Sequence, residues 1–576
     1  MVKKSALKIP VTILIPLFLF LSISFAEELA QPVYSVKEEL DVKVTMRDGI
    51  RLSTNIYRPD DPGKFPALLM RTPYSNGGSG NTSGQFFAKR GYAVVIQDTR
   101  GRYESEGVFD AFQPEALDGY DMQQWVGNQP WCNGKIGTFG GSYVGFTQWL
   151  PAPFQSPYLV TMFPVVTFAD FHDMVYYGGA ARVSLFSSWS FEMSIPYGFD
   201  PKRMLEQQNK ILQSLPLIEQ DKVAGWKIPF LRDWLAHPEH DLYWERTSIK
   251  NGYSKIKASA YNVGGWFDIC LAGTLKNFTA MTSKDIDPGI RGKQKLLIGP
   301  WVHSLSKDGK VGEMDFGKDA VVDMQELELQ WFDSQLKGKD TGITNQDPVR
   351  IFVMGENVWR NEKEWPLART KYRNYYFHSG GRANTLKGDG VLDTINPDKE
   401  KPDRFVYDPG NPVSSSPDSP TGQNAVEERE DVLVYSTALL PEAVEVTGPV
   451  EVLVYASSSA PNTDFTAKLV DVYPDGKAIR LCDGIIRASF RDGDTNTSNI
   501  EPDKIYIYRI DLWATSNVFK KGHRIRVEIS SSNFPRFNRN LNTGGNCATD
   551  STWVEAQQTL YHSKEYPSCI VLPVIE

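Results

Sequence analysis

Ile136-Gly137-Thr138-Phe139 is followed at once by Gly140-Gly141-Ser142-Tyr143-Val144-Gly145. A serine on a sharp turn between a buried strand and a helix needs very small neighbours, because its backbone is strained and the two elements pass close together. The free N–H groups at the start of such a helix can hold a developing oxyanion. The run therefore predicts a nucleophilic serine at residue 142, although Val144 departs from the G-x-S-x-G pattern. The alternative is a glycine-rich turn whose serine only caps the next helix.

Short apolar segments without alternation lie on both sides of this serine, as is typical of strands buried on both faces. They are residues 67–70, 93–96, 136–139, 160–166, 258–263 and 296–298. Helical segments such as residues 114–126 separate several of them, which predicts an open, mainly parallel α/β sheet. Residues 41–56 alternate around the turn Arg47-Asp48-Gly49 and predict a β-hairpin.

With 576 residues, the chain exceeds the size of one hydrophobic core, so we expect two or three domains. Residues 169–254 change to polar and aromatic segments with helical spacing, which predicts a helical cap inserted into the α/β core. The core then consists of residues 27–168 and 255–345. Residues 346–576 are alternating and rich in hairpins, which predicts a C-terminal all-β sandwich.

The N-terminus has the pattern of a secretory signal peptide over residues 1–26. Three lysines precede the apolar run 9–25, and Ser24-Phe25-Ala26 fits a cleavage site near Ala26. Two prolines interrupt the run, so we expect cleavage and export to the periplasm or the medium, not a stable membrane anchor. Cleavage removes three lysines, which moves the formal charge from −8 to −11. A chain this acidic is not expected to bind nucleic acid.

Five cysteines are present, an odd number, so at least one stays free if the others pair. Export permits disulfides without requiring them. Cys547 and Cys569 are both near the C-terminus and can be joined, but their spacing does not decide it. The full set is Cys132, Cys270, Cys482, Cys547 and Cys569.

A nucleophilic serine needs a base and an acidic group that orients the base. Downstream of Ser142, one apolar segment runs into a glycine turn and Asp268, and the next runs into a loop with His303. These positions predict Asp268 as the orienting acid and His303 as the base. The alternatives are a helix cap for Asp268 and a loop histidine bonded to backbone for His303.

Other histidines have positions that could support chemistry. His172 also follows a strand end, but it precedes the cap, where lining the pocket or stabilising the cap is the favoured role. His237 and His240 have an H-x-x-H spacing that can bind a metal. The intervening proline and the lack of a third nearby ligand favour a turn there instead.

Three blocks of the chain resemble the catalytic blocks of the cocaine esterase-like hydrolases. That family also includes α-amino acid ester hydrolases, glutaryl cephalosporin acylases and X-prolyl dipeptidyl aminopeptidases. The blocks are residues 140–145, Gly265-Trp266-Phe267-Asp268 and Gly299-Pro300-Trp301-Val302-His303-Ser304. Further matching segments are residues 46–52, 97–102, 177–180, 464–472 and 532–537. The resemblance implies an α/β-hydrolase core with an inserted helical cap and a C-terminal jelly-roll domain. These parts agree with the domains predicted above from the hydrophobic pattern of the sequence.

The resemblance also implies an oxyanion hole made by the backbone N–H of Tyr143 and the hydroxyl of Tyr74. A phenol is a good neutral donor, and the loop after residue 70 lies beside the serine turn in such a sheet; the alternative is a packing tyrosine. No metal or organic cofactor is implied. We expect the substrate pocket to include His172, Asp173, Tyr177 and Trp266.

The sequence defines the substrate less closely than it defines the catalytic residues. Members that act on α-amino esters carry extra carboxylates just after the triad aspartate, where this chain has Ile269-Cys270-Leu271, so that subfamily is disfavoured. Asp170, Asp173 and Glu192 can still place a negative charge in the cap, or be ordinary helix-face residues.

The favoured hypothesis is an exported serine hydrolase that cleaves a small carboxylic ester or amide through an acyl-enzyme at Ser142. The second is an X-prolyl dipeptidyl peptidase with the same triad, which acts on short peptides and needs a carboxylate for the free N-terminus. The third is a carbohydrate- or surface-binding protein whose hydrolase core has lost activity. The sequence carries no indication of an oligomeric state.

Overall fold

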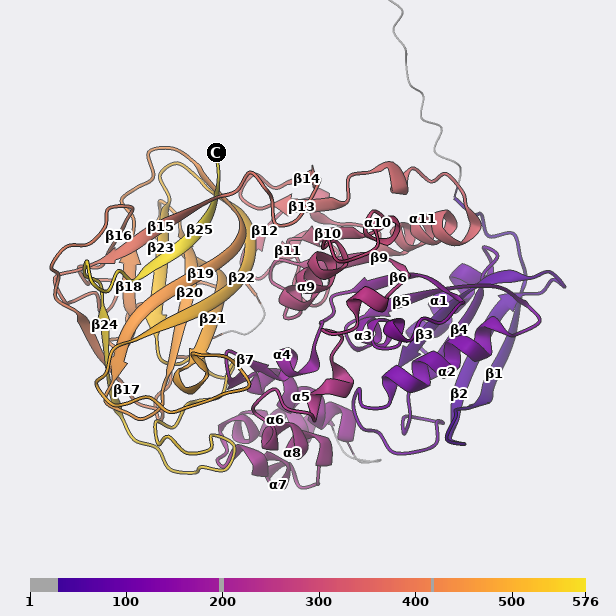
Figure 1. Cartoon of the computed structure of the whole chain (residues 1–576), viewed down its shortest axis with the longest axis horizontal. Coiled ribbons are helices and arrows are strands. Elements are labelled where there is room, and N and C mark those ends of the chain that lie inside the picture. Colours follow the sequence, from indigo (N-terminus) through magenta and orange to yellow (C-terminus); the bar gives the residue numbers. More distant parts are fainter. Residues whose placement is uncertain (1–28, 196–200, 416–418) are drawn as a thin grey trace, which may run out of the picture.

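The computed structural model describes residues 29–195, 201–415 and 419–576. The predicted signal peptide, residues 1–26, lies outside these ranges. Figure 1 shows an α/β part, an all-β part and a group of helices that lies between them. None of the helices in the described ranges has the length and apolar character needed to cross a membrane.

The α/β part is built on a mixed sheet of ten strands in the order β1-β2-β4-β3-β5-β6-β9-β10-β13-β14. All neighbours from β4 to β13 are parallel, whereas β1, β2 and β14 pair in antiparallel fashion. The mainly parallel sheet and the N-terminal hairpin are thus confirmed. The strands are β1 Val36–Thr45, β2 Arg51–Pro59, β3 Phe65–Thr72, β4 Ala93–Asp98, β5 Cys132–Gly141, β6 Leu159–Val165, β9 Ser259–Gly265, β10 Lys295–Gly299, β13 Val349–Val353 and β14 Val358–Glu362.

Helices cover both faces of this sheet, which explains why apolar and polar residues do not alternate along its strands. In β3, Leu68 packs in the same cluster as Phe332 of α11, whereas its neighbour Leu69 packs with Met122 of α2. Successive side chains of a strand point to opposite faces, so both need to be apolar when both faces are covered. The core helices are α1 Ser79–Ala88, α2 Glu115–Gly127, α3 Tyr143–Trp149, α9 Leu271–Met281, α10 Pro288–Arg291 and α11 Met324–Lys337.

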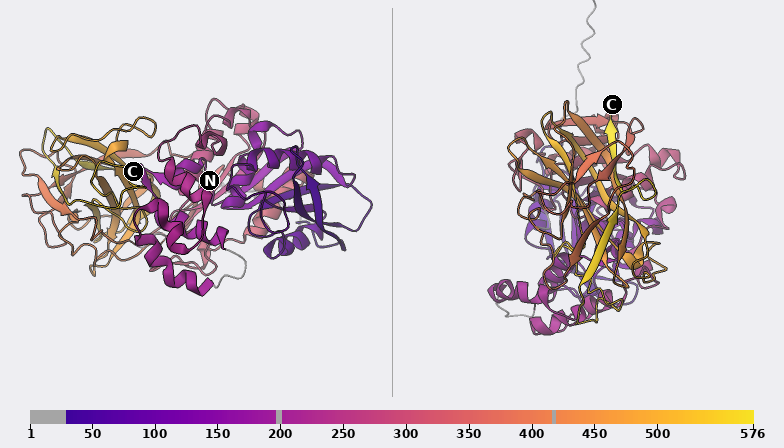
Figure 2. Two further views of the ribbon diagram at one scale, coloured as in Figure 1. Left: turned by 90° about the horizontal axis from the view of Figure 1, so that it is seen from below. Right: turned by 90° about the vertical axis from the view of Figure 1, so that its left-hand side faces the viewer.

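The helical cap follows β6 and lies against the C-terminal side of the sheet and the all-β part (Figures 1 and 2). One apolar cluster joins Phe186 and Trp234 of the cap to Phe146 of α3, so the cap packs directly over the serine turn. Its elements are α4 Phe171–Val175, β7 Tyr176–Tyr177, β8 Ala180–Ala181, α5 Val183–Ser194, α6 Pro201–Gln213, α7 Gln220–Ala224 and α8 Pro229–Ala236.

The C-terminal part is all-β, as predicted, and has its own apolar core, which includes Val452, Phe465 and Val527. Its strands are β15 Lys371–His378, β16 Val391–Asp393, β17 Asp403–Tyr407, β18 Leu433–Ser436, β19 Val444–Ser458, β20 Asp464–Val472, β21 Ala478–Arg487, β22 Tyr506–Phe519, β23 Arg524–Ser530, β24 Ala556–Tyr561 and β25 Cys569–Ile575. A two-stranded ribbon, β11 Lys310–Val311 and β12 Met314–Asp315, precedes α11.

The α/β sheet continues past the boundary that we drew between residues 345 and 346. β13 pairs in parallel with β10, and β14 pairs with β13, so both strands belong to the α/β sheet. β13 is mostly buried, and most residues of β14 are at least partly exposed, so neither segment shows by its own pattern which sheet it joins. Strand pairing depends on backbone hydrogen bonds and not on the side-chain pattern.

All five cysteines fall within the described ranges, and no disulfide joins any two of them there. Cys547 and Cys569 therefore do not form the disulfide that their positions would allow in sequence. Four of the five are buried, and only Cys547 is partly exposed.

Candidate active site

Ser142 lies on a strained turn between β5 and α3, with φ 58° and ψ −122°. Its glycine neighbours are required by close packing. A Cβ on Gly140 would lie 2.3 Å from Val144 Cγ1, and one on Gly145 would lie 2.6 Å from Thr167 Cβ. Non-glycine residues rarely adopt such a conformation, and they do so mainly at functional sites.

His303 and Asp268 complete a hydrogen-bonded chain with this serine. His303 Nε2 lies 2.9 Å from Ser142 Oγ, and His303 Nδ1 lies 2.7 Å from Asp268 Oδ1. A carboxylate accepts, so Nδ1 carries the hydrogen and Nε2 accepts from the serine hydroxyl. Asp268 is fully buried.

Strand register brings these two residues together although they are 35 positions apart. β9 and β10 are parallel neighbours in which Gly265 pairs with Gly299. Asp268 and His303 follow these glycines by three and four residues, so both leave the same edge of the sheet. The structure thus brings together the three residues that the sequence nominated.

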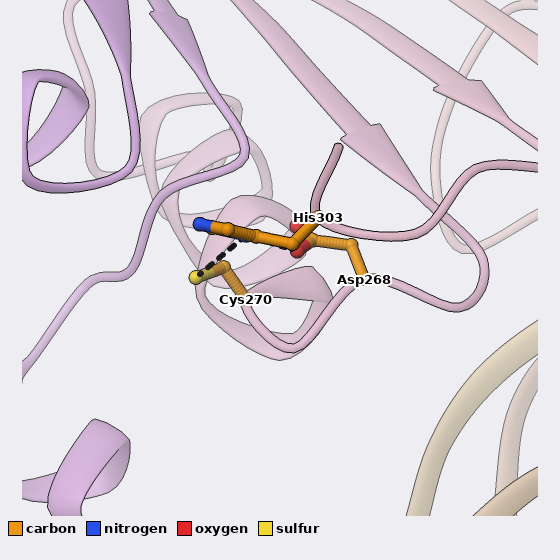
Figure 3. Close-up of side chains that lie close together, drawn as sticks. All are labelled: Asp268, Cys270 and His303. Atoms are coloured by element: carbon orange, nitrogen blue, oxygen red, sulfur yellow. Dashed lines mark hydrogen bonds and ion pairs between the residues drawn. The ribbon is translucent and has the colours of Figure 1, made fainter. Parts of the chain in front are cut away.

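Cys270 is a further neighbour of the imidazole, and no sequence pattern singled it out (Figure 3). Its Sγ lies 3.9 Å from His303 Nδ1. Asp268, Cys270 and His303 are close enough to one another to hold a metal ion. Both imidazole nitrogens already face Ser142 and Asp268, however, so the arrangement fits proton transfer better than metal binding.

Two groups close to Ser142, the backbone N–H of Tyr143 and the hydroxyl of Tyr74, are available to donate a hydrogen bond. Tyr143 is the first residue of α3, so its N–H has no helical acceptor. Tyr74 follows β3, and its hydroxyl oxygen accepts a hydrogen bond of 3.0 Å from Trp189 Nε1, which leaves its own hydrogen available. Burial of the hydroxyl raises the pKa of Tyr74 to about 12.

A buried polar network holds the side chain of Tyr143, and no sequence pattern predicted this network. The Tyr143 hydroxyl donates to Glu115 Oε1 at 2.9 Å and accepts from the Phe112 N–H at 3.2 Å. Glu115 in turn forms a buried ion pair with Arg71, at the end of β3. Burial raises the pKa of Glu115, and the charge of Arg71 opposes this. The network ties α2, α3 and β3 together at the first residue of α3.

A cavity of about 200 Å³ opens beside Ser142. Its walls are mainly aromatic and aliphatic, and Glu192 of α5 is the one acidic residue among them. In the described part of the chain, no hydrogen bond or ion pair to the Glu192 carboxylate is formed. The lining residues are Tyr74, Phe112, Ser142, Tyr143, Phe168, Phe171, Met174, Leu185, Phe186, Trp189, Glu192, Trp234, Ile269 and His303.

The structure corrects the four residues that we predicted for the substrate pocket, since none of them lines this cavity. His172 and Asp173 lie on α4 between Phe171 and Met174, which do face the cavity. Because successive helical residues point about 100° apart, His172 and Asp173 are turned away from it.

Tyr177 and Trp266 are each held elsewhere by a backbone carbonyl. The Tyr177 hydroxyl donates to Asp511 O in the all-β part at 3.1 Å. Trp266 Nε1 donates to Phe352 O at 2.7 Å within the core. Buried tyrosine and tryptophan usually bond through their polar atom in this way, so aromatic content near a motif did not identify the cavity wall.

The chain is similar to known proteins over nearly its whole length. Residues 48–305 match the X-Pro dipeptidyl-peptidase (S15 family) domain, and residues 341–571 match the X-Pro dipeptidyl-peptidase C-terminal non-catalytic domain. A cocaine esterase of Rhodococcus sp. is 39% identical over 94% of this chain and 99% of its own. A protein of Bacillus anthracis named as an Xaa-Pro dipeptidyl-peptidase is 22% identical over 89% of this chain and 87% of its own. The solved structure of an α-amino acid ester hydrolase is 25% identical, covers 97% of this chain and 100% of its own, and has a TM-score of 0.79.

Proposed function

The chain belongs to the S15 family of serine hydrolases, which includes esterases and X-Pro dipeptidyl-peptidases, and we propose that it is an exported esterase that works through an acyl-enzyme at Ser142. The observation that carries this proposal is the hydrogen-bonded chain Ser142–His303–Asp268 at the wall of an apolar cavity. Export rests on the signal-peptide pattern of residues 1–26.

The proposed reaction has two halves that share one proton path. Ser142 Oγ attacks the acyl carbonyl while its proton passes to His303 Nε2, and Asp268 stabilises the resulting imidazolium. His303 then gives the proton to the departing alcohol. In the second half, His303 takes a proton from water, the hydroxide attacks the acyl-enzyme, and the proton returns to Ser142.

Both halves pass through a tetrahedral intermediate with a negatively charged oxygen. In our proposal, the Tyr143 N–H and the Tyr74 hydroxyl donate to this oxygen. Both donors are in place before the reaction: the helix start holds the first, and the hydrogen bond from Trp189 holds the second. Preorganised donors of this kind lower the barrier because they need no rearrangement as charge develops.

The cavity favours a small ester with an apolar acyl group, and a pair of substrates tests this. We expect kcat/KM for p-nitrophenyl butyrate to exceed that for Gly-Pro-p-nitroanilide by far, with Ser142→Ala as the blank for both. A ratio below one would overturn the esterase proposal in favour of dipeptidyl-peptidase activity at the same triad.

Glu192 is the specific observation in favour of this second candidate. A dipeptidyl-peptidase needs a carboxylate near the scissile bond to bind the free N-terminus of the peptide. Of the three cap acids named above, only Glu192 lines the cavity. Asp170 caps α4 and contacts His240, and Asp173 forms an ion pair with Lys276.

We expect Glu192 to favour substrates that carry a positive charge. Butyrylcholine and 3,3-dimethylbutyl butyrate have nearly the same shape, but only the first is charged. The wild-type protein should prefer butyrylcholine in kcat/KM by about threefold to tenfold, because a carboxylate and aromatic walls both attract a quaternary ammonium. The effect should lie in KM, since the ammonium carries the same charge in the bound ester and in the transition state.

In Glu192→Gln the preference should fall clearly below the wild-type value, because only the aromatic walls then attract the ammonium, while hydrolysis of the neutral ester stays unchanged. Glu219→Gln is the matched control, because Glu219 lies in the cap outside the cavity and pairs with Lys222. Equal preference in the wild type and in Glu192→Gln would show that Glu192 does not sense the charge of the substrate.

A further inference from the structure

The side of α4 that faces away from the cavity carries a second cluster of polar groups. His172 and Asp173 of α4 meet Asp494, which lies in the loop between β21 and β22 of the all-β part. Each residue offers one ligand atom, and these three atoms lie within 4.8 Å of one another. We propose that these three residues form a binding site for a divalent transition-metal ion such as Zn²⁺. The proposal does not depend on the esterase activity.

The hydrogen bonding of His172 is the observation that points to a cation. His172 Nε2 lies 2.9 Å from the carbonyl oxygen of Pro238. A carbonyl only accepts, so Nε2 carries the ring hydrogen and Nδ1 of the neutral imidazole presents a lone pair. Nδ1 is buried and has no hydrogen-bond partner within the described ranges, since Asp173 Oδ1 is 3.9 Å away. His172 itself is only 3% exposed.

An unpartnered lone pair that faces two carboxylates is unfavourable unless something positive lies between them. Metal-binding histidines have just this arrangement, because the second ring nitrogen usually donates to a carbonyl or a carboxylate and thereby fixes the tautomer. Pro238 O already serves as that acceptor. The ring is therefore oriented for a ligand role before any ion binds.

The kinds of ligand favour zinc or manganese over calcium. One imidazole nitrogen and two carboxylate oxygens suit first-row divalent ions, whereas calcium and magnesium prefer oxygen ligands alone. Ligand atoms around tetrahedral zinc lie about 3.4 Å apart, so the cluster must close slightly. Asp173 and Asp494 are both partly exposed and can move toward a buried His172, and water can fill the fourth position.

Two lysines compete with a metal ion for the same carboxylates. Lys276 Nζ lies 2.7 Å from Asp173 Oδ2, and Lys250 Nζ lies 3.4 Å from Asp173 Oδ1. Their side chains are 53% and 40% exposed, so each can swing into solvent when an ion arrives. Neutralising Lys276 should therefore tighten metal binding.

The site would connect the cap to the all-β part at the back of the substrate cavity. Phe171 and Met174, on the opposite side of α4, line that cavity. An ion held by His172 and Asp494 would fix α4 and with it this part of the cavity wall.

Equilibrium dialysis of the full-length mature protein against Zn²⁺, with metal content measured by mass spectrometry, tests the proposal. We expect one ion per chain in the wild type, and binding at least about tenfold weaker in His172→Gln and in Asp494→Asn. The glutamine amide of the first variant can still donate to Pro238 O, so this variant removes the ligand and keeps the structural bond. His237→Gln, which alters a surface histidine outside the cluster, is the control and should bind like the wild type.

Three further measurements separate this site from the cluster around His303. Zn²⁺ should raise Tm in the wild type, in His237→Gln and in Lys276→Met but not in His172→Gln or Asp494→Asn, and Ca²⁺ should raise Tm in none of them. Lys276→Met should bind Zn²⁺ about threefold or more tightly, a gain that misfolding cannot mimic. Zn²⁺ at the triad would block labelling of Ser142 by a fluorophosphonate. Absence of binding in the wild type, or binding that is undiminished in His172→Gln whether or not it blocks this labelling, would overturn the proposal.

Discussion

Replacement of Ser142 by alanine is expected to lower kcat on p-nitrophenyl butyrate by on the order of 10⁶-fold. In the proposed mechanism, the Ser142 hydroxyl oxygen forms the acyl-enzyme, and its proton passes first to His303 Nε2, to which the hydroxyl is hydrogen-bonded. Initial-rate assays with the purified protein, at substrate concentrations above KM, give the ratio directly.

The same variant should also fail to react with a fluorophosphonate probe, which labels only an activated serine. Ser304→Ala is the control, because Ser304 is an exposed neighbour of His303 and has no part in the proposed mechanism. Turnover near the wild-type value in Ser142→Ala, or retained labelling, would remove Ser142 from the mechanism.

Tyr74→Phe is expected to lower kcat by roughly 10²–10³-fold, with a much smaller change in KM. The variant keeps the aromatic ring that meets Tyr143 edge-on and removes the hydroxyl, which is the proposed donor to the oxyanion and also the acceptor of the Trp189 Nε1 hydrogen bond. Since the oxyanion exists only in and near the transition state, the loss should appear in kcat. Steady-state kinetics on p-nitrophenyl butyrate measures both constants.

Trp189→Phe provides the comparison for Tyr74. It removes the N–H that holds the Tyr74 oxygen but leaves the phenol in place, so its loss in kcat should be smaller than that of Tyr74→Phe. The pKa of Tyr74 is raised to about 12, so the phenol stays protonated, and able to donate, at any pH well below that value. Equal kcat in Tyr74→Phe and the wild type would exclude Tyr74 as an oxyanion donor.

The residues closest to the chemistry could be nominated from the sequence because each lies in a short local pattern. Ser142 is flanked by glycines that a strained turn requires, and Asp268 and His303 each follow an apolar strand within a few residues. Parallel strands end at the same edge of a sheet, so residues that follow them meet there. The three residues do meet, although 161 positions separate Ser142 from His303.

The residues of the cavity wall could not be predicted in the same way, because they depend on the direction in which each side chain of the cap points. His172 and Asp173 were suitable by position and chemistry, but α4 presents Phe171 and Met174 to the cavity instead. One residue of displacement on a helix turns a side chain by about 100°, and no periodicity can be read from a helix of five residues.

By itself, the sequence determined the mainly parallel α/β sheet, the all-β C-terminal part and the nomination of Ser142, Asp268 and His303. All of these rest on interactions between residues close in the chain or on the regular geometry of parallel strands. Only the tertiary structure decided that β13 and β14 join the α/β sheet, that Glu115 and Arg71 support Tyr143, and that Glu192 lines the cavity. These features arise from contacts between distant segments, whose side-chain directions are set by packing and leave no spacing pattern in the chain.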